Sequence, residues 1–397
     1  MSQRRVALWL STSALCALLV FSSILVFQLA VDPFGVWGSP VVRGWNNAKV
    51  VMPNTNRIFK PYQYMERKPE VVFLGTSHVE WGFPPVWPGT PSSEVYNFGL
   101  GTLSVFEVAE YVKLFLEPPL PRVVVLEMDP VAFMQDREDF IPGFSIERLD
   151  ALKSFFSPLG YALRLKELVF NFDAIRKSFE TTEESRKHPG QRLYDDSGYY
   201  IRQGEGQRPT RSRFQSRIWR YARGYYRAKQ FSEDGVSIFK NVISSLREQG
   251  VEVVLFSSPL FVDVQMIINS QGRWSGYEAI KREMAGFTPF WDFANVNPLT
   301  VDKNNYTDGS HFAGDVGRLV VNKISGANPT ETTGGALAGS GVLLTAGNAS
   351  RELKRMRKDL EDWEKGHSAL LKAIRECEKT GDRKAFDAAT KAIYRFR

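Results

Sequence analysis

Two short segments carry residues that could perform nucleophilic catalysis. The first is Gly75-Thr76-Ser77-His78, which directly follows the apolar run of residues 71–74. A serine at the point where a buried strand turns into a helix presents its hydroxyl at the carboxyl edge of the sheet, near helix amides that favour a developing negative charge. A serine at such a turn is also a common helix N-cap, so this segment alone does not specify an enzyme.

The second segment, Asp308-Gly309-Ser310-His311, precedes an amphipathic run. A serine nucleophile needs a base, and the base needs a carboxylate that fixes its tautomer. Of the four histidines, His311 alone has an aspartate three residues before it, whereas His78 adjoins the serine without an acidic residue at a matching spacing. We therefore predict that Ser77 is the nucleophile, His311 the general base and Asp308 its orienting carboxylate. The alternatives are a helix cap at Asp308 and an ordinary loop histidine.

The surrounding pattern predicts the elements that would bring these segments together. Short β-branched and aromatic runs bounded by turn residues predict buried strands at 71–74, 95–98, 123–126, 251–256 and 289–293. Helix-like stretches lie between or after them at 103–116, 233–249, 274–285 and 316–324. This alternation predicts an α/β protein whose parallel sheet is covered on both faces, with its site at the carboxyl ends of the strands.

Residues 39–69, punctuated by four prolines, are expected to be irregular, and an insert at 130–232 interrupts the alternation. The insert is too long for a simple loop, so we expect it to have structure of its own or to cap the site in part. In its second half, arginines interleave with aromatic residues at helical spacing. We favour a helix that packs its aromatic face on the core and leaves the arginines in solvent. A surface for an anionic polymer or lipid headgroups is the alternative.

The N-terminus predicts a membrane anchor at residues 1–32. The 26 residues from Val6 to Val31 carry no charge, and as a helix they would span about 39 Å, enough to cross a bilayer. Arg4 and Arg5 precede the run, so the positive-inside bias places the N-terminus in the cytoplasm and the following chain in the periplasm or outside the cell. A cleaved signal peptide is the alternative, although Gln28 and Ala30 make a poor cleavage site.

The C-terminal part divides into a predicted flexible linker and a helical tail. Residues 326–350 are rich in Gly, Ala, Ser and Thr. In the tail, 351–397, apolar residues from Leu353 to Cys377 follow a heptad-like spacing, and Thr380-Gly381-Asp382 interrupts it. We predict a helical hairpin, with oligomerisation through the seam as the alternative. The tail carries five of the seven net positive charges, and the rest of the chain is nearly neutral.

The two catalytic segments resemble those of the SGNH (GDSL-like) hydrolase superfamily over about residues 69–130 and 233–325. Gly75-Thr76-Ser77-His78 stands in the place of the nucleophile block and Asp308-Gly309-Ser310-His311 in that of the Asp-x-x-His block. The resemblance implies a three-layer α/β/α catalytic domain over 33–325, with the triad named above. Asn97, Gly99 and Gly101 follow the second predicted strand and look like the glycine block, which implies a role in the oxyanion hole or substrate binding.

The third block departs from the family. In place of Gly-x-Asn-Asp the chain has Leu126-Glu127-Met128-Asp129, without an asparagine. The oxyanion hole would then depend on backbone groups such as the N–H of Ser77. With the anchor, this variation looks like the membrane-anchored branch that includes alginate and peptidoglycan O-acetyltransferases and the D-alanyl transfer protein of teichoic acid synthesis. That likeness implies a polysaccharide or cell-wall polymer as acceptor and a multipass membrane-bound O-acyltransferase as partner.

Other chemistry has no support in the sequence. The chain has no Cys-x-x-Cys pair, no His-Glu-x-x-His and no P-loop, so no metal or other cofactor is expected. Nucleic acid is not an expected partner outside the cytoplasm. The leading hypothesis is an anchored serine O-acyltransferase. An esterase with water as acceptor and a non-catalytic, polymer-binding scaffold are the alternatives.

Overall fold

The computed structural model describes residues 3–49, 52, 55–134, 143–154, 157–169, 172–201, 209–326 and 339–396. The chain divides into two compact units. One comprises 1–66 and 143–193, and the other comprises 67–142 and 194–397. The expected catalytic domain over 33–325 is therefore split, because 33–66 and part of the predicted insert belong to the first unit.

The second unit is built on a six-stranded sheet. Its order is β2-β1-β3-β4-β5-β6, and β1 to β5 run parallel. The sequence predicts both ends of each of the first five strands to within one residue, because each strand is a short apolar run. The strands are β1 (Val71–Gly75), β2 (Val95–Gly99), β3 (Val123–Glu127), β4 (Glu252–Ser257), β5 (Phe290–Asp292) and β6 (Val342–Leu344).

A purely parallel sheet was predicted, but the sheet is mixed. β6 pairs antiparallel with β5, with Trp291 opposite Leu343. This strand lies within the predicted linker, where its three apolar residues stand among Gly, Ser and Thr that suggest a coil. Residues 327–338 of the linker lie outside the described residues.

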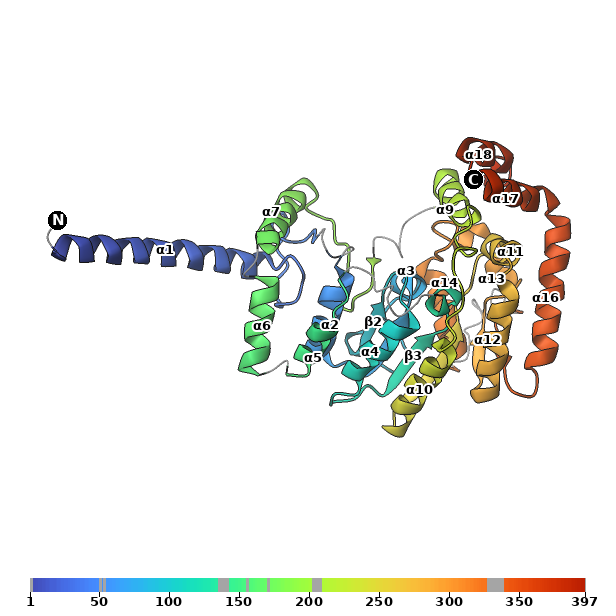
Figure 1. The fold of residues 1–397 in the computed structure, drawn as a ribbon, viewed down its shortest axis with the longest axis horizontal. Helices are drawn as coiled ribbons and strands as arrows, with labels where there is room; N and C mark the ends of the chain where they lie inside the picture. The colour runs from blue at the N-terminus through green and yellow to red at the C-terminus, as the bar shows by residue number, and fades with distance from the viewer. Residues whose placement is uncertain are drawn as a thin grey trace. The chain divides into compact units, whose positions relative to one another are not determined.

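Helices of the second unit cover the sheet in two groups. α4 packs against α10, which also contacts α12, while α14 packs against α3 (Figure 1). Since the chain turns back after β2 to place β3 on the other side of β1, right-handed crossovers put α3 and α4 on opposite faces. The α-helices described in this unit before the tail are α3 (Ser77–Gly82), α4 (Val105–Phe115), α9 (Arg211–Ala222), α10 (Gly235–Glu248), α11 (Val262–Ser270), α12 (Trp274–Phe287), α13 (Pro298–Val301) and α14 (Gly314–Ile324).

Close packing of α14 on α3 depends on a glycine. A Cβ added at Gly317 of α14 would lie 1.7 Å from the carbonyl oxygen of Gly82, at the end of α3. No side chain fits there, so Gly317 permits the two backbones to touch. This contact fixes the chain that follows β5 beside the helix that follows β1.

The first unit consists of helices. They are α1 (Gln3–Val31), α2 (Asn56–Arg67), α5 (Ile146–Leu152), α6 (Pro158–Leu168) and α7 (Phe172–Lys187). α2 corrects the expectation of an irregular 39–69. It tolerates Pro61 because that residue lies in a segment with buried Phe59, Tyr62 and Tyr64, whose burial outweighs one lost backbone hydrogen bond.

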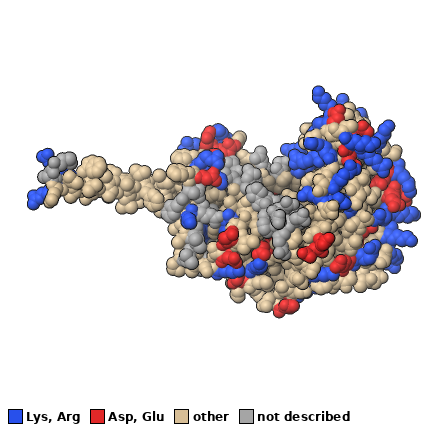
Figure 2. Space-filling view, viewed as in Figure 1, with Lys and Arg blue, Asp and Glu red and all other residues tan. Residues whose placement is uncertain are grey.

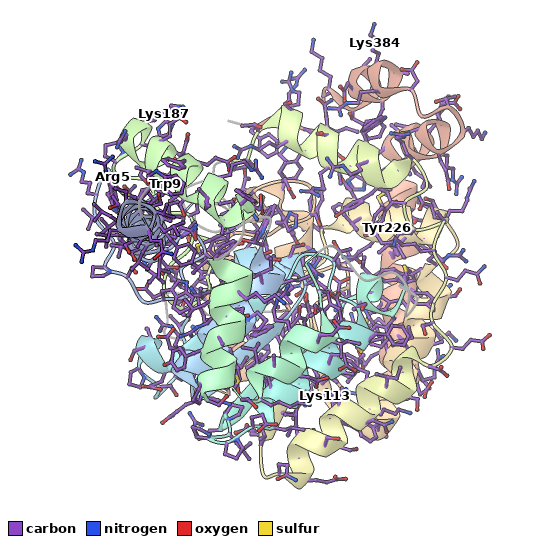
Figure 3. All side chains as sticks on the ribbon, turned by 60° about the vertical axis from the view of Figure 1, so that its left-hand side comes forward. Arg5, Trp9, Lys113, Lys187, Tyr226 and Lys384 are labelled. Atoms are coloured by element: carbon purple, nitrogen blue, oxygen red, sulfur yellow. The ribbon has the colours of Figure 1, made fainter. Side chains whose placement is uncertain are left out.

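α1 is long and apolar enough to span a membrane. It has 29 residues with a mean hydropathy of 2.5, and 11% of its most apolar window is buried. Its large apolar side chains, Trp9 among them, radiate outward from the helix (Figure 3). Charge is confined to its N-terminal end (Figure 2).

The tail forms three helices in place of the predicted hairpin. They are α16 (Ala349–Gly366), α17 (Ser368–Thr380) and α18 (Arg383–Thr390). The break at Gly381 agrees with the prediction, since that residue adopts φ 66°. The additional break follows Gly366, a weak helix former, and there the His367 ring stacks on Trp363 at 4.0 Å.

The apolar seam of the tail packs on its own chain. Leu360, Leu370, Ile374 and Cys377 are buried in the same core cluster as Phe214 of α9. The structure thus uses the seam inside one molecule, which differs from the oligomerisation alternative.

We expect Ile374→Ala to lower the free energy of unfolding by about 2–5 kcal/mol, because it leaves a cavity in a fully buried site. Urea denaturation of the full chain measures it, with the exposed Lys372→Ala as control. A loss below about 1 kcal/mol, the scale of a surface substitution, would show that the seam does not pack on the core.

Candidate active site

Ser77 lies at the carboxyl end of β1, as the first residue of α3. Thr76 caps this helix by accepting a hydrogen bond from the His78 amide. Being first in the helix, the Ser77 amide has no intrahelical acceptor. Because β1 lies between β2 and β3, where the chain reverses its direction across the sheet, Ser77 stands at the crevice that binds ligands in open α/β sheets.

The loop that carries Asp308 and His311 is closed by backbone pairing. The Thr307 amide donates to the His311 carbonyl at 2.8 Å, and Tyr306 pairs with Phe312. Asp308 Oδ1 accepts the amides of Ser310 at 2.7 Å and His311 at 2.9 Å. Asp308 therefore holds its own loop in shape as well as facing the imidazole.

The structure brings the three predicted residues into one hydrogen-bonded chain. Ser77 Oγ lies 2.9 Å from His311 Nε2. On the other side of the ring, His311 Nδ1 lies 3.0 Å from Asp308 Oδ2 and 3.1 Å from Oδ1. This is the spacing that a serine, a base and its orienting carboxylate need.

The environment keeps His311 neutral and Asp308 charged. Burial lowers the pKa of His311 to about 4, with Arg217 and His78 adding to the effect and Asp308 opposing it. The Trp81 ring, centred 3.7 Å from the imidazole, contributes to that burial. Burial alone would raise the pKa of Asp308, but His311, Arg217 and the loop amides hold it well below its usual range. At neutral pH His311 can thus accept a proton from Ser77.

Helix α9 of the insert supplies part of the site. Arg217 donates to Asp308 Oδ2 from Nε at 3.1 Å and from Nη2 at 3.0 Å. Arg217, Arg220 and Tyr221 line a pocket of about 210 Å³ together with Ser77 and His311. The expectation that the α9 arginines lie in solvent is therefore wrong for Arg217, while the aromatic face packs on the core as predicted, since Phe214 is fully buried.

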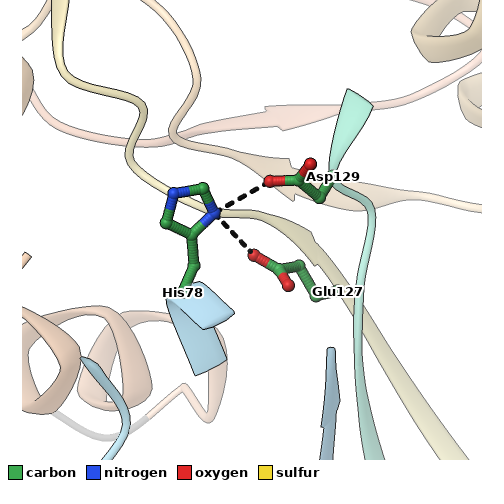
Figure 4. Close-up of side chains that lie close together, drawn as sticks. All are labelled: His78, Glu127 and Asp129. Carbon is green, nitrogen blue, oxygen red and sulfur yellow. Dashed lines mark hydrogen bonds and ion pairs between the residues drawn. The ribbon is translucent and has the colours of Figure 1, made fainter. Parts of the chain in front are cut away.

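A second buried histidine, His78, lies near His311 and beside two carboxylates, Glu127 and Asp129 (Figure 4). His78 Nδ1 is 2.8 Å from Asp129 Oδ2 and 3.5 Å from Glu127 Oε1. His78 Nε2 is 3.3 Å from Ser310 Oγ. Sequence reasoning missed this group because it sought the carboxylate close to His78 along the chain. The signal was the pair Glu127, the last residue of β3, and Asp129, two residues beyond it, since β3 lies next to β1.

His78 is held in its charged form. Burial by itself lowers the pKa of His78, but hydrogen bonds and charge interactions with Asp129 and Glu127 outweigh it and raise the pKa well above 6.5. Burial would raise the pKa of Glu127, yet bonds from His78, Ser258 and the Thr76 amide lower it. The two imidazoles, whose centroids are 5.7 Å apart, therefore have pKa values displaced in opposite directions.

The cluster of His78, Glu127 and Asp129 has the ligand types of a metal site. Its carboxylates already accept hydrogen bonds from the surrounding protein, however. Glu127 Oε2 accepts the Thr76 amide at 2.5 Å, and its Oε1 accepts the Ser258 hydroxyl. Asp129 Oδ1 accepts the Val131 amide at 2.7 Å. With His78 Nδ1 close to both carboxylates, the three side chains form an ion-paired cluster in this structure.

The residues predicted for the oxyanion hole lie elsewhere. Asn97 Nδ2 donates to the carbonyls of Val79 and Phe83, each at 2.8 Å, so its side chain ties β2 to α3. The Gly99 amide donates to Asn97 Oδ1 at 2.9 Å. A Cβ at Gly99 would lie 2.2 Å from the Glu80 amide nitrogen, so this glycine permits close packing on α3.

Gly101 does not line the pocket, although its neighbour Thr102 does. In this structure Asn97 and Gly99 have packing and hydrogen-bonding roles, and a role of the glycine block in the oxyanion hole stays a prediction. Their position just after a strand is the same in either role, which is why the sequence could not separate the two.

No family model matches this chain, and no curated protein matches it. The geometry of the site is therefore the main guide to what this protein does.

We expect Arg217→Met to raise the pKa of His311 above its value of about 4, because Arg217 is one of the charges that disfavour the imidazolium. Titration of the histidine ring signals by NMR measures this shift. Arg220→Met, which changes the same type of side chain on the same pocket wall, is the matched control. An unchanged His311 titration in Arg217→Met would contradict the electrostatic account.

Proposed function

We propose that this protein is a membrane-anchored serine O-acyltransferase, which transfers an acyl group, most simply acetyl, to a hydroxyl of an extracytoplasmic polysaccharide or cell-wall polymer. The observation that carries the proposal is the hydrogen-bonded chain from Ser77 through His311 to Asp308. All three residues are inside or beside one pocket at the carboxyl edge of the sheet, where α/β proteins bind ligands.

The chemistry follows from the order of the three groups. Ser77 Oγ attacks the carbonyl carbon of the acyl donor while its proton moves to His311 Nε2. The tetrahedral intermediate then breaks the bond to the leaving alkoxide, which takes the proton back from His311. An acceptor hydroxyl next gives its proton to His311 Nε2 and attacks the acyl-serine. The bond between the acyl carbon and Ser77 Oγ then breaks, Ser77 takes the proton back from His311, and the acceptor leaves with the acyl group. Asp308 stabilises the imidazolium that forms in each half.

The membrane location of the proposal is supported by α1. Many of its large apolar side chains are exposed, Leu8 and Trp9 among them, and a lipid bilayer would cover such side chains. Arg4 and Arg5 at its start favour a cytoplasmic N-terminus. A donor on the cytoplasmic side would then require a partner that carries the acyl group across, such as a multipass O-acyltransferase.

A likeness to the SGNH superfamily fits this proposal. Helices on both faces of the sheet would correspond to the three layers of that fold. A serine directly after β1 and an Asp-x-x-His loop that follows β5 in the chain support the likeness. The mixed sheet and the second histidine set this chain apart from the expected pattern.

An esterase uses the same residues with water as acceptor, and it differs only in what reaches the acyl-serine. Arg217 and Arg220 on the pocket wall favour a ligand that is polar or anionic over water alone.

We expect Ser77→Ala and His311→Ala each to lower the hydrolysis of p-nitrophenyl acetate by the full-length protein in detergent by at least about a thousandfold, since either change removes the covalent step. Ser270→Ala, a serine in α11 that bonds only its own helix at Ile267, is the control. Equal hydrolysis rates in the wild type and all variants would contradict the proposal that Ser77 and His311 catalyse acyl transfer.

The acid limb of kcat/KM should lie near pH 4, with activity rising as pH rises through it, because His311 must lose its proton to act as base. A pH profile of kcat/KM measures it. A limb near 6.5, the ordinary value for histidine, would contradict the buried, neutral imidazole.

A scaffold would behave in the opposite way. If polymer binding without catalysis were the function, Ser77→Ala would leave the cellular phenotype intact and Arg220→Glu would abolish it. Arg220 is the suitable change because Arg217 bonds Asp308, so that altering Arg217 would disturb the triad as well.

A further inference from the structure

Each of the two Ser–His dipeptides at the site is paired with the other. Ser77 bonds His311 at 2.9 Å, while Ser310 bonds His78 at 3.3 Å. Each histidine in turn has a carboxylate at its other nitrogen, Asp308 for His311 and Asp129 for His78. The second set is as buried as the first, since Ser310 is 4% and His78 7% exposed. The proposed acyl transfer uses Ser77, His311 and Asp308, and it assigns no role to Ser310 or His78.

The hydrogen-bond directions at Ser310 differ from those at Ser77. Tyr221 Oη donates to Ser310 Oγ at 3.1 Å. Arg217, which can only donate, also bonds the Tyr221 hydroxyl, so the phenolic hydrogen is free for Ser310. His78 carries a hydrogen at Nδ1 toward Asp129, and as an imidazolium it carries one at Nε2 toward Ser310 as well.

Ser310 Oγ thus accepts two hydrogen bonds, which occupy both of its lone pairs. Its own hydrogen remains, and within the described part of the chain no acceptor for it is present. Ser310 lines the same pocket as Ser77. A hydroxyl that accepts from a cation and a phenol is polarised, so it donates more strongly than an isolated serine.

On the proposed function, which this inference presupposes, we propose that the Ser310 hydroxyl is an oxyanion-hole donor for the acyl group on Ser77, and that His78 and Tyr221 are positioning residues that aim and polarise it. Ser310 then supplies what the missing asparagine of the third block would supply in the SGNH superfamily. The Ser77 amide is the natural second donor. The proton of Ser310 stays on Ser310 throughout, and Ser310 carries no acyl group.

The test compares kcat and KM of full-length Ser310→Ala with wild type on p-nitrophenyl acetate. We expect kcat to fall by about 10²–10³ with KM little changed, because a donor to the oxyanion acts in the transition state. The matched control is Ser270→Ala, which should keep wild-type values.

A second measurement separates an oxyanion donor from a structural residue. The same variants are assayed on p-nitrophenyl thionoacetate, whose carbonyl sulfur accepts hydrogen bonds poorly. The preference for oxygen over sulfur should fall by about tenfold in Ser310→Ala and by less in Tyr221→Phe, which removes only one of the two donors to Ser310. Since Tyr221→Phe keeps the ring in place, it tests the proposal even if Ser310→Ala does not fold.

Two results would overturn the inference. An unchanged kcat and oxygen preference in both variants would show that Ser310 has no contact with the reacting oxygen. Acetyl found on Ser310 by peptide mass spectrometry would make Ser310 a nucleophile. In either case Ser77→Ala remains the separate test of the proposed function, because its activity is lost if Ser77 is the nucleophile, whatever Ser310 does.

Discussion

A charged carboxylate kept in the protein interior is the constraint on which this site depends. Asp308 is 8% exposed, and leaving it ionised there is unfavourable unless donors surround it. Two loop amides, the His311 ring and the Arg217 guanidinium provide those donors. The two amide bonds also hold the shape of the loop. The Arg217 bond also holds α9 of the insert against the pocket.

The same balance of burial and counter-charge sets the two histidines apart. His311 faces one carboxylate, with Arg217 and His78 as nearby positive charges, so burial prevails and the ring is neutral. His78 faces two carboxylates, and their combined effect exceeds the cost of burial. Two titratable groups whose environments push their pKa values in opposite directions are typical of sites that need a base and a cationic donor together.

The sequence predicted the parts of this structure that depend on local pattern. The five parallel strands are short apolar runs. Ser77 was predicted from the end of the first strand, and Asp308 and His311 were predicted from their three-residue spacing. What it could not predict depends on distance in space. Asp129 reaches His78 because β3 lies beside β1, and Arg217 reaches Asp308 because α9 returns to the pocket. In the tail, packing of Ile374 on the core of its own chain decided the arrangement that the spacing left open.

The packing roles of glycines also depend on distance in space. Gly99 and Gly317 both permit backbones to touch. This requirement depends on the neighbouring element and has no signature in the residues around each glycine.

The central claim is that Ser77 is the nucleophile of an acyl transfer. Its most direct test is to react the full-length protein with a fluorophosphonate and map the modified peptide by mass spectrometry. The account predicts modification at Ser77 that is lost in His311→Ala. Modification at another residue, or none in a folded protein, would contradict it.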